Sequence, residues 1–170
     1  MRKVLIIDTS ILCVWLKVRG METCGSDNDS WNYDRVNDKI ESEKAQSATF
    51  VLPLATIIET GNHITHAKGD IKPFVDGFVD LMHATAKEET PWAAFTEQSA
   101  LWSPDGLTKL ANAWKETGLR KQSLGDASIV NVANYYAEAG CEVEILTGDK
   151  DLRSYQPATP ACYIPRRRKH

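Results

Sequence analysis

The sequence has no hydrophobic run long enough to cross a membrane, no Cys-x-x-Cys pair and no internal repeat. A membrane-spanning helix needs about 20 consecutive apolar residues, whereas the first apolar run, at 4–7, is interrupted by Asp8. This interruption also argues against a signal peptide. Four scattered cysteines in 170 residues favour a reducing compartment over a disulfide framework. We therefore expect a cytoplasmic protein with no membrane partner.

A large excess of charge of one sign is also absent. Twenty Lys and Arg residues stand against 23 Asp and Glu residues, for a net charge of −3, so any contact with a polyanion must come from a local basic patch. Hydrophobic residues make up 42% and charged residues 25% of the chain, as in ordinary globular domains. We expect one domain over 1–165, followed by a basic tail, RRRKH, at 166–170.

Short β-branched runs alternate with segments of helical periodicity. This alternation favours an α/β fold whose parallel sheet is covered on both faces. Residues 20–33 are rich in Gly, Asp, Asn and Ser and predict a loop. The predicted strands are 3–7, 49–53, 92–96, 142–147 and an edge strand at 161–164; the predicted helices are 11–16, 34–46 (solvated), 54–67, 71–88, 103–118 (between Ser103 and Gly118 caps), 123–140 and a short turn or helix at 149–155.

Acidic residues follow each of the main predicted strands. Asp8 directly follows the first strand, Glu59 lies early in the helix after the second, and Asp149 follows the third. Asp126 opens the helix before the third strand, on the same face as its apolar positions. Because a ligand site in a parallel sheet lies beyond the carboxyl ends of the strands, we expect these acids to meet at one edge.

Four converging carboxylates cannot all stay ionised without a counter-charge. An all-oxygen site suits Mg²⁺ or Mn²⁺, and such a site can activate water and stabilise the leaving oxygen in phosphodiester cleavage. Ser10 is spaced to orient the water, and Thr147 to hydrogen-bond a carboxylate. Asp151 is either a fifth ligand or a surface residue. The candidates for contacts with the substrate backbone are Arg120, Lys121, Lys150, Arg153, Arg166, Arg167 and Arg168.

At these residues the sequence resembles the PIN-domain nucleases. The family pattern is an apolar strand that ends in Asp, followed by Thr and then Asn or Ser, here Asp8-Thr9-Ser10. The matching later acids are Glu59 in TIIETGN, Asp126 in SLGDASIVNVA and Asp149 in ILTGDKDL.

The resemblance covers nearly the whole chain. It implies a three-layer α/β/α sandwich with a central, mainly parallel sheet, Mg²⁺ or Mn²⁺ at the four acids, and cleavage of RNA. Many relatives are VapC-type toxins held inactive by an antitoxin protein, and a homodimer is a further expectation of this resemblance. Compact toxins of this type are shorter; the additional length here lies around 20–47 and 91–118.

Each acid also has a structural interpretation. Asp8 and Asp149 could cap the helices that follow them, because Asp is a favoured N-cap residue. Ser123 and Asp126 are spaced as a variant capping box. Glu59 could be a solvated helix residue, although it lies too far into its helix to cap it.

Other side chains allow two interpretations each. His63 and His66 could form a transition-metal pair, but polar helix surface is the favoured interpretation beside hard oxygen ligands. Trp92, Trp102 and Trp114 could stack on bases, although core packing is favoured for most of them. The tail could bind phosphates or act as a solubilising terminus.

Two rival functions remain open. A phosphatase of the haloacid-dehalogenase type also has a strand-ending Asp and a late Gly-Asp, but it needs an acid two residues after the nucleophile, where this chain has Ser10. The other rival is a non-catalytic module with a nuclease-like fold that binds RNA or protein.

Overall fold

The computed structural model describes residues 1–155 and 157. The predicted edge strand at 161–164, the tail at 166–170 with Arg166, Arg167 and Arg168, and Cys162 lie outside the described residues. The elements in chain order are β1 (Lys3–Ile7), α1 (Thr9–Trp15), β2 (Thr23–Ser26), β3 (Asp29–Asn32), α2 (Tyr33–Ala45), β4 (Thr49–Val51), α3 (Leu54–His66), α4 (Lys72–Ala86), the 3₁₀ helix η1 (Phe95–Trp102), α5 (Pro104–Leu119), α6 (Leu124–Glu138), β5 (Glu142–Leu146) and α7 (Lys150–Ser154).

A parallel sheet of three strands, in the order β4–β1–β5, lies at the centre of this mixed α/β chain. The expected parallel sheet is therefore present, with β1 in the middle. Ile7 pairs with Leu146 at the carboxyl ends of β1 and β5, so the segments that follow these two strands begin side by side. Within the described part of the chain, every helix falls short of the length and apolar character that crossing a bilayer requires.

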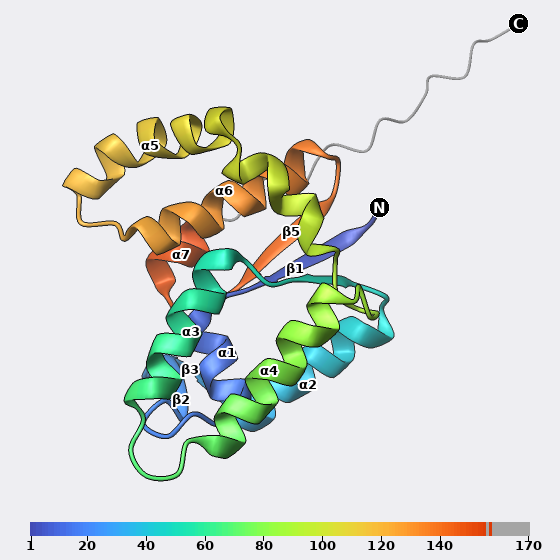
Figure 1. Cartoon of the computed structure of the whole chain (residues 1–170), viewed down its shortest axis with the longest axis vertical. Helices are drawn as coiled ribbons and strands as arrows, with labels where there is room; N and C mark the ends of the chain where they lie inside the picture. The colour runs from blue at the N-terminus through green and yellow to red at the C-terminus, as the bar shows by residue number, and fades with distance from the viewer. Residues whose placement is uncertain (156, 158–170) are drawn as a thin grey trace, which may run out of the picture.

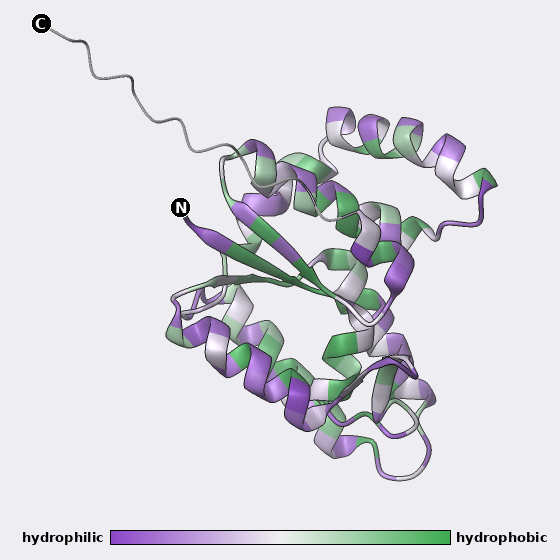
Figure 2. Cartoon of the chain, turned by 180° about the vertical axis from the view of Figure 1, so that it is seen from behind, coloured by the Kyte–Doolittle hydropathy of each residue, from purple (hydrophilic) through white to green (hydrophobic). Residues whose placement is uncertain are grey.

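Helices flank both faces of this sheet. Alternate residues of β1 point to opposite faces: Leu5 and Ile7 belong to a buried cluster with α1 and α2, whereas Val4 and Ile6 belong to another with α6. Figure 1 shows α5 and α6 on one side of the strands and α1, α2 and α4 on the other. The strands are mostly hydrophobic in Figure 2, as expected for strands covered on both faces.

The predicted loop at 20–33 is instead a β-hairpin. Ser26 pairs with Asp29, so Asp27 and Asn28 form the two-residue turn that such residues favour. Gly25 has φ +94°, and a side chain there would collide with the carbonyl oxygen of Asp29. The prediction was wrong because polar turn residues dominate the segment's composition and hide its two short strands.

The predicted strand at 92–96 is also wrong. Trp92 makes a single parallel bridge to Phe50, and the chain then enters η1. Gln98 holds this helical turn in place by donating from Nε2 to the carbonyl oxygen of Leu52 (3.2 Å), and Glu97 Oε2 accepts from the Tyr136 hydroxyl (3.0 Å). These tertiary hydrogen bonds override the local apolar pattern.

The caps of α5 were predicted correctly only at its beginning. Ser103 Oγ accepts from the backbone N–H of Gly106 (3.1 Å), and Pro104 is the first helical residue. Gly118, the predicted cap, lies inside the helix, which continues to Leu119 and has Arg120 as its C-cap.

Helix α2 is joined to the sheet by a four-residue ion network. Lys3 Nζ lies 2.6 Å from Glu43 Oε1 and 3.0 Å from Glu144 Oε2, while Lys39 Nζ lies 2.7 Å from Glu43 Oε1 and 2.8 Å from Glu144 Oε1. Burial would raise the pKa of Glu43, but the hydrogen bonds from the two lysines outweigh it and lower that pKa. The predicted solvated helix therefore buries one charged position, together with Val36 and Ile40.

We predict that Glu43→Gln destabilises the fold by about 2 kcal/mol at pH 7, because it leaves two lysines without their best-buried partner. Urea denaturation measures this change, and Glu41→Gln, which alters the exposed pair with Lys44, should change stability by less than about 0.5 kcal/mol. The lowered pKa of Glu43 means that its contribution is present above the ordinary value of 4.5 and is lost as the pH falls through the lowered value. Equal effects of the two variants would contradict this role.

Candidate functional site

Asp8 occupies the N-cap position of α1 but does not cap the helix. Its side chain is 5% exposed and makes no capping hydrogen bond to the described backbone. Instead, Asp8 Oδ2 accepts from Ser10 Oγ (2.7 Å) and from Thr147 Oγ1 (2.8 Å). The capping interpretation of Asp8 is therefore wrong. Thr147 hydrogen-bonds a carboxylate as predicted, whereas Ser10, which was predicted to orient a water, donates to Asp8 itself.

Backbone groups after β5 fix the direction of these two hydrogen bonds. The N–H of Gly148 donates to Ser10 Oγ (3.1 Å), and the N–H of Asp149 donates to Thr147 Oγ1 (2.9 Å). Each hydroxyl therefore accepts from the backbone and gives its only proton to Asp8. The two hydrogen bonds therefore hold the Asp8 carboxylate in one orientation.

Glu59 reaches the same edge from α3. Its Oε2 accepts from Thr9 Oγ1 (3.0 Å), one residue after Asp8. Its Oε1 lies against Gly125, where an added Cβ would come within 2.1 Å of that oxygen. A glycine at the beginning of α6 therefore lets the Glu59 carboxylate lie beside the residue that precedes Asp126.

Asp126 is close enough to Asp8 and Asp149 to feel their charges. Burial raises the pKa of Asp126, and the negative charges of Asp8 and Asp149 raise it further, while hydrogen bonds with Ser123 act in the opposite direction. Ser123 Oγ accepts from the N–H of Asp126 (2.9 Å). The capping-box interpretation is therefore correct, because Ser123 and Asp126 hydrogen-bond each other at the beginning of α6. Asp126 also interacts electrostatically with Asp8 and Asp149.

Asp149 is the N-cap of α7. Its Oδ1 accepts from the N–H groups of Asp151 (2.7 Å) and Leu152 (3.3 Å). The predicted helix-capping role is therefore confirmed for Oδ1. Asp149 and Asp151 are both exposed, and they line a pocket of about 290 Å³ together with Asp126.

Two of the predicted basic residues also line this pocket. Arg120 and Lys121 are exposed there, and Lys150 is exposed at the beginning of α7. Arg153 is engaged elsewhere, because its guanidinium pairs with Asp29 and donates from Nη2 to the Thr147 carbonyl (2.9 Å). Arg153 therefore joins the hairpin to the end of β5 rather than offering a free cation.

Several residues at this edge were missed by the sequence analysis. Thr9 and Gly125 orient Glu59, and Cys24 lies so close to Gly148 that an added Cβ would come within 2.6 Å of its Sγ. Thr9 and Gly125 are neighbours of predicted acids in the sequence, and this adjacency could have identified them as residues of the site. Cys24 had no such signal, because its position depends on the unpredicted hairpin.

The chemistry of the donors fits a hard cation. The side chains that converge here offer carboxylate and hydroxyl oxygens, and burial raises the pKa of the neighbouring Cys13 to about 12, which removes its thiolate as a ligand at neutral pH. Among the described residues, no three Asp, Glu, His or Cys side chains are grouped closely enough to hold one ion. The four acids therefore match Mg²⁺ or Mn²⁺ in donor type without forming a ready-made ligand cluster.

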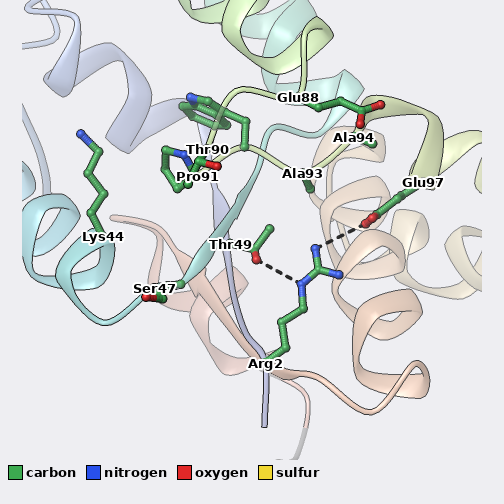
Figure 3. A pocket seen from close by; sticks show the side chains of 12 residues that line it. Arg2, Lys44, Ser47, Thr49, Glu88, Thr90, Pro91, Ala93, Ala94 and Glu97 are labelled. Carbon is green, nitrogen blue, oxygen red and sulfur yellow. Dashed lines mark hydrogen bonds and ion pairs between the residues drawn. The ribbon is translucent and has the colours of Figure 1, made fainter.

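A larger pocket, of about 620 Å³, lies at the opposite end of the sheet, where Arg2 precedes β1 (Figure 3). Arg2 donates from Nε to Thr49 Oγ1 (3.1 Å), and its Nη2 lies 3.7 Å from Glu97 Oε2. Lys44 pairs with Glu41. Arg2, Lys44 and Glu97 of this larger pocket thus already have partners, and none of the four predicted acids lines it, so we place the candidate site at the acid edge.

The remaining aromatic and histidine candidates divide between core and surface. Trp92 is 8% exposed and packs edge-on against Phe50, whereas Trp102 and Trp114 are 37% and 36% exposed. Core packing is therefore confirmed for Trp92 only. His63 and His66 lie on the exposed surface of α3, as the favoured interpretation expected.

Comparisons with family models, with curated proteins and with solved structures each give no match to this chain.

We predict that Asp8→Asn lowers the pKa of Asp126, because it removes one of the charges that raise it. Carboxyl ¹³C NMR titration in metal-free buffer measures the change, and Asp105→Asn, at the exposed beginning of α5, should leave the pKa of Asp126 unchanged. Because a raised carboxyl pKa costs stability as the pH rises, Asp126→Asn should also stabilise the fold at pH 7, by about 1 kcal/mol or less. An unmoved pKa in Asp8→Asn would show that the two carboxylates do not interact.

Proposed function

We propose that this protein is a metal-dependent endoribonuclease that hydrolyses RNA phosphodiester bonds, with a PIN-like fold. The observation that carries the proposal is the Asp8 carboxylate, which is buried at a helix N-terminus, does not cap that helix, and instead accepts hydrogen bonds from Ser10 and Thr147. A buried carboxylate left out of the helix cap, beside further acids, is typical of a functional site rather than a structural one.

Mg²⁺ or Mn²⁺ would be held by Asp8, Glu59, Asp126 and Asp149, with Asp151 as a further candidate. When bound, such an ion supplies charge neutralisation at the scissile phosphate and lowers the pKa of water. The chain's own contribution is orientation: Thr9 aligns Glu59, and the two hydroxyls align Asp8. These bonds limit the rotation of two acids before substrate arrives.

The substrate's phosphates need a cationic partner that the acids cannot provide. Arg120 and Lys121 line the pocket that also contains Asp126, Asp149 and Asp151. Cations opposite a row of carboxylates let a polyanion approach the acids despite their repulsion. RNA therefore suits this groove better than a neutral ligand does.

The non-catalytic module is the second candidate, and one observation favours it. Within residues 1–155 and 157, no group of three potential ligands is compact enough for one ion. Such a module would bind RNA without cutting it, so the two functions are separated by cleavage. The phosphatase is disfavoured because Ser10, at the position of its general acid, donates its proton to Asp8. An antitoxin, a toxin role and a homodimer stay predictions of the resemblance.

We predict that Asp8→Asn and Asp126→Asn each lower RNA cleavage at least about 100-fold in kcat/KM, a change of about 2.7 kcal/mol. The assay uses defined RNA and DNA with Mg²⁺ or Mn²⁺, and an excess of EDTA should abolish cleavage. Asn at position 8 retains an oxygen that accepts from Ser10 and Thr147, so the fold should survive.

Asp80→Asn is the matched control, since Asp80 is an exposed acid on α4; it should cleave at the wild-type rate. Wild-type rates in the Asp8→Asn protein would sink the nuclease proposal. RNA binding by a wild-type protein that never cleaves would favour the binding module instead.

We also predict that Arg120→Ala and Lys121→Ala each weaken RNA binding and reduce the slope of log K against log salt concentration by roughly 1. Binding is measured with the Asp8→Asn protein, so that cleavage does not interfere. Lys68→Ala, an exposed lysine between α3 and α4, should leave the slope unchanged. A slope that changes equally in all three variants would mean that the pocket does not contact phosphates.

A further inference from the structure

The segment 147–149, which follows β5, is also held by the hairpin of β2 and β3. Arg153 donates from Nη2 to the Thr147 carbonyl oxygen (2.9 Å), and its Nη1 pairs with Asp29 Oδ2 at the beginning of β3. The other oxygen of Asp29, Oδ1, lies 2.8 Å from Nη2 of Arg35 on α2. The Asp29 carboxylate therefore connects α2, through Arg153, to the residue whose hydroxyl donates to Asp8.

Arg153 makes both of its contacts with one guanidinium group. This group is planar and rigid, so a carboxylate on one nitrogen sets the direction in which the other nitrogen donates. Hydrogen bonds from Arg153 and then from Arg35 lower the pKa of Asp29, so Asp29 is ionised at neutral pH. Thr147 is 1% exposed, which leaves water little access to replace the guanidinium at its carbonyl oxygen.

The hairpin also packs directly against Gly148. A Cβ added at Gly148 would come within 2.6 Å of Cys24 Sγ and within 2.8 Å of the backbone nitrogen of Gly25. The N–H of Gly148 donates to Ser10 Oγ (3.1 Å). The hairpin therefore limits the movement of the backbone group that directs the Ser10 hydroxyl.

We propose that Asp29 and Arg153 are positioning residues for the acid edge, which hold the segment 147–149 so that Asp8 and Asp149 keep the orientation that cleavage requires. The inference rests on the proposed function and deepens it, because it names residues outside the substrate pocket that control the acids. Side chains that orient the ligands of a metal commonly affect activity almost as strongly as the ligands do.

Thr147 is the residue through which this control reaches both acids. Its hydroxyl donates to Asp8 Oδ2 (2.8 Å) and accepts from the N–H of Asp149 (2.9 Å). Its carbonyl oxygen accepts from Arg153, so all three contacts belong to one residue. A change in the position of Arg153 would therefore be passed on to Asp8 and Asp149 together.

The contacts of Arg153 argue against a direct role in binding phosphate. Two of its nitrogens already donate within the protein, and Arg153 is not among the residues that line the pocket with Asp126 and Asp149, whereas Arg120 and Lys121 are. A residue that acts only through Thr147 should change the chemical step and leave substrate affinity unchanged.

The first test is amide hydrogen exchange by NMR, which needs neither metal nor substrate. Asp29→Asn keeps the shape of the side chain but removes the charge that orients the guanidinium. We expect faster exchange at the N–H groups of Gly148 and Asp149, because the hydroxyls that accept from them are held less firmly. Asp27→Asn is the matched control, since Asp27 is an exposed acid in the turn of the same hairpin; its protein should exchange like the wild type.

The second test is RNA cleavage at saturating Mn²⁺. Asp29→Asn and Arg153→Lys should each lower kcat roughly 10- to 100-fold, with KM within about twofold of the wild-type value because neither residue lines the pocket. Arg153→Lys keeps the charge but lacks the planar group, so it separates orientation from charge. Asp27→Asn should retain the wild-type kcat, and urea denaturation checks that every variant is folded under the assay conditions.

A wild-type kcat in folded Asp29→Asn and Arg153→Lys would overturn the inference, whether or not exchange is faster, and would leave the nuclease proposal intact. A raised KM with an unchanged kcat in Arg153→Lys would also reject it, since Arg153 would then contact the substrate. If the wild-type protein cleaves no RNA, the proposed function fails. The exchange rates of Gly148 and Asp149 in Asp29→Asn then decide alone whether the hairpin holds the segment.

Discussion

The rest of the site depends on how the charge of Asp8 is held at the end of β1. Two hydroxyls donate to one of its oxygens, and each hydroxyl is itself held by a backbone N–H from the segment after β5. Because β1 and β5 are parallel neighbours in register, this four-bond arrangement follows directly from the sheet. Without the segment after β5, Asp8 would lose Thr147, and Ser10 would lose the backbone N–H that directs its hydroxyl.

The position of Asp8 affects a second acid, Asp126. Its charge contributes to the raised pKa of Asp126, and Glu59 is kept beside it by Thr9 and by the absence of a side chain at Gly125. A fold that needed only helix caps would gain nothing from this convergence. The raised pKa of Asp126 shows that its ionised form is less stable in the folded chain than in water.

The sequence predicts those residues of this edge that lie at the end of a strand or within the next few positions. An apolar run that ends in Asp8, and the apolar run before Thr147, indicate parallel strands whose ends meet. The hairpin β2–β3 and the helix η1 were missed, because polar composition hides two short strands and because the hydrogen bonds of Gln98 and Glu97 are made to distant residues. The role of Arg153 was missed for the same reason, since its partner Asp29 belongs to that hairpin.

The segments 20–47 and 91–118 each contribute residues near the predicted acids. Within 20–47, the hairpin reaches the acid edge through Cys24 against Gly148 and through Asp29 with Arg153. Within 91–118, η1 and α5 supply Trp102 and Leu107 to an apolar pocket that Glu59 borders. The acids themselves come from four different elements: Asp8 follows β1, Asp149 follows β5, Glu59 lies on α3 and Asp126 lies on α6. The surroundings of this edge therefore depend on residues of the hairpin, η1 and α5 as well as on the sheet.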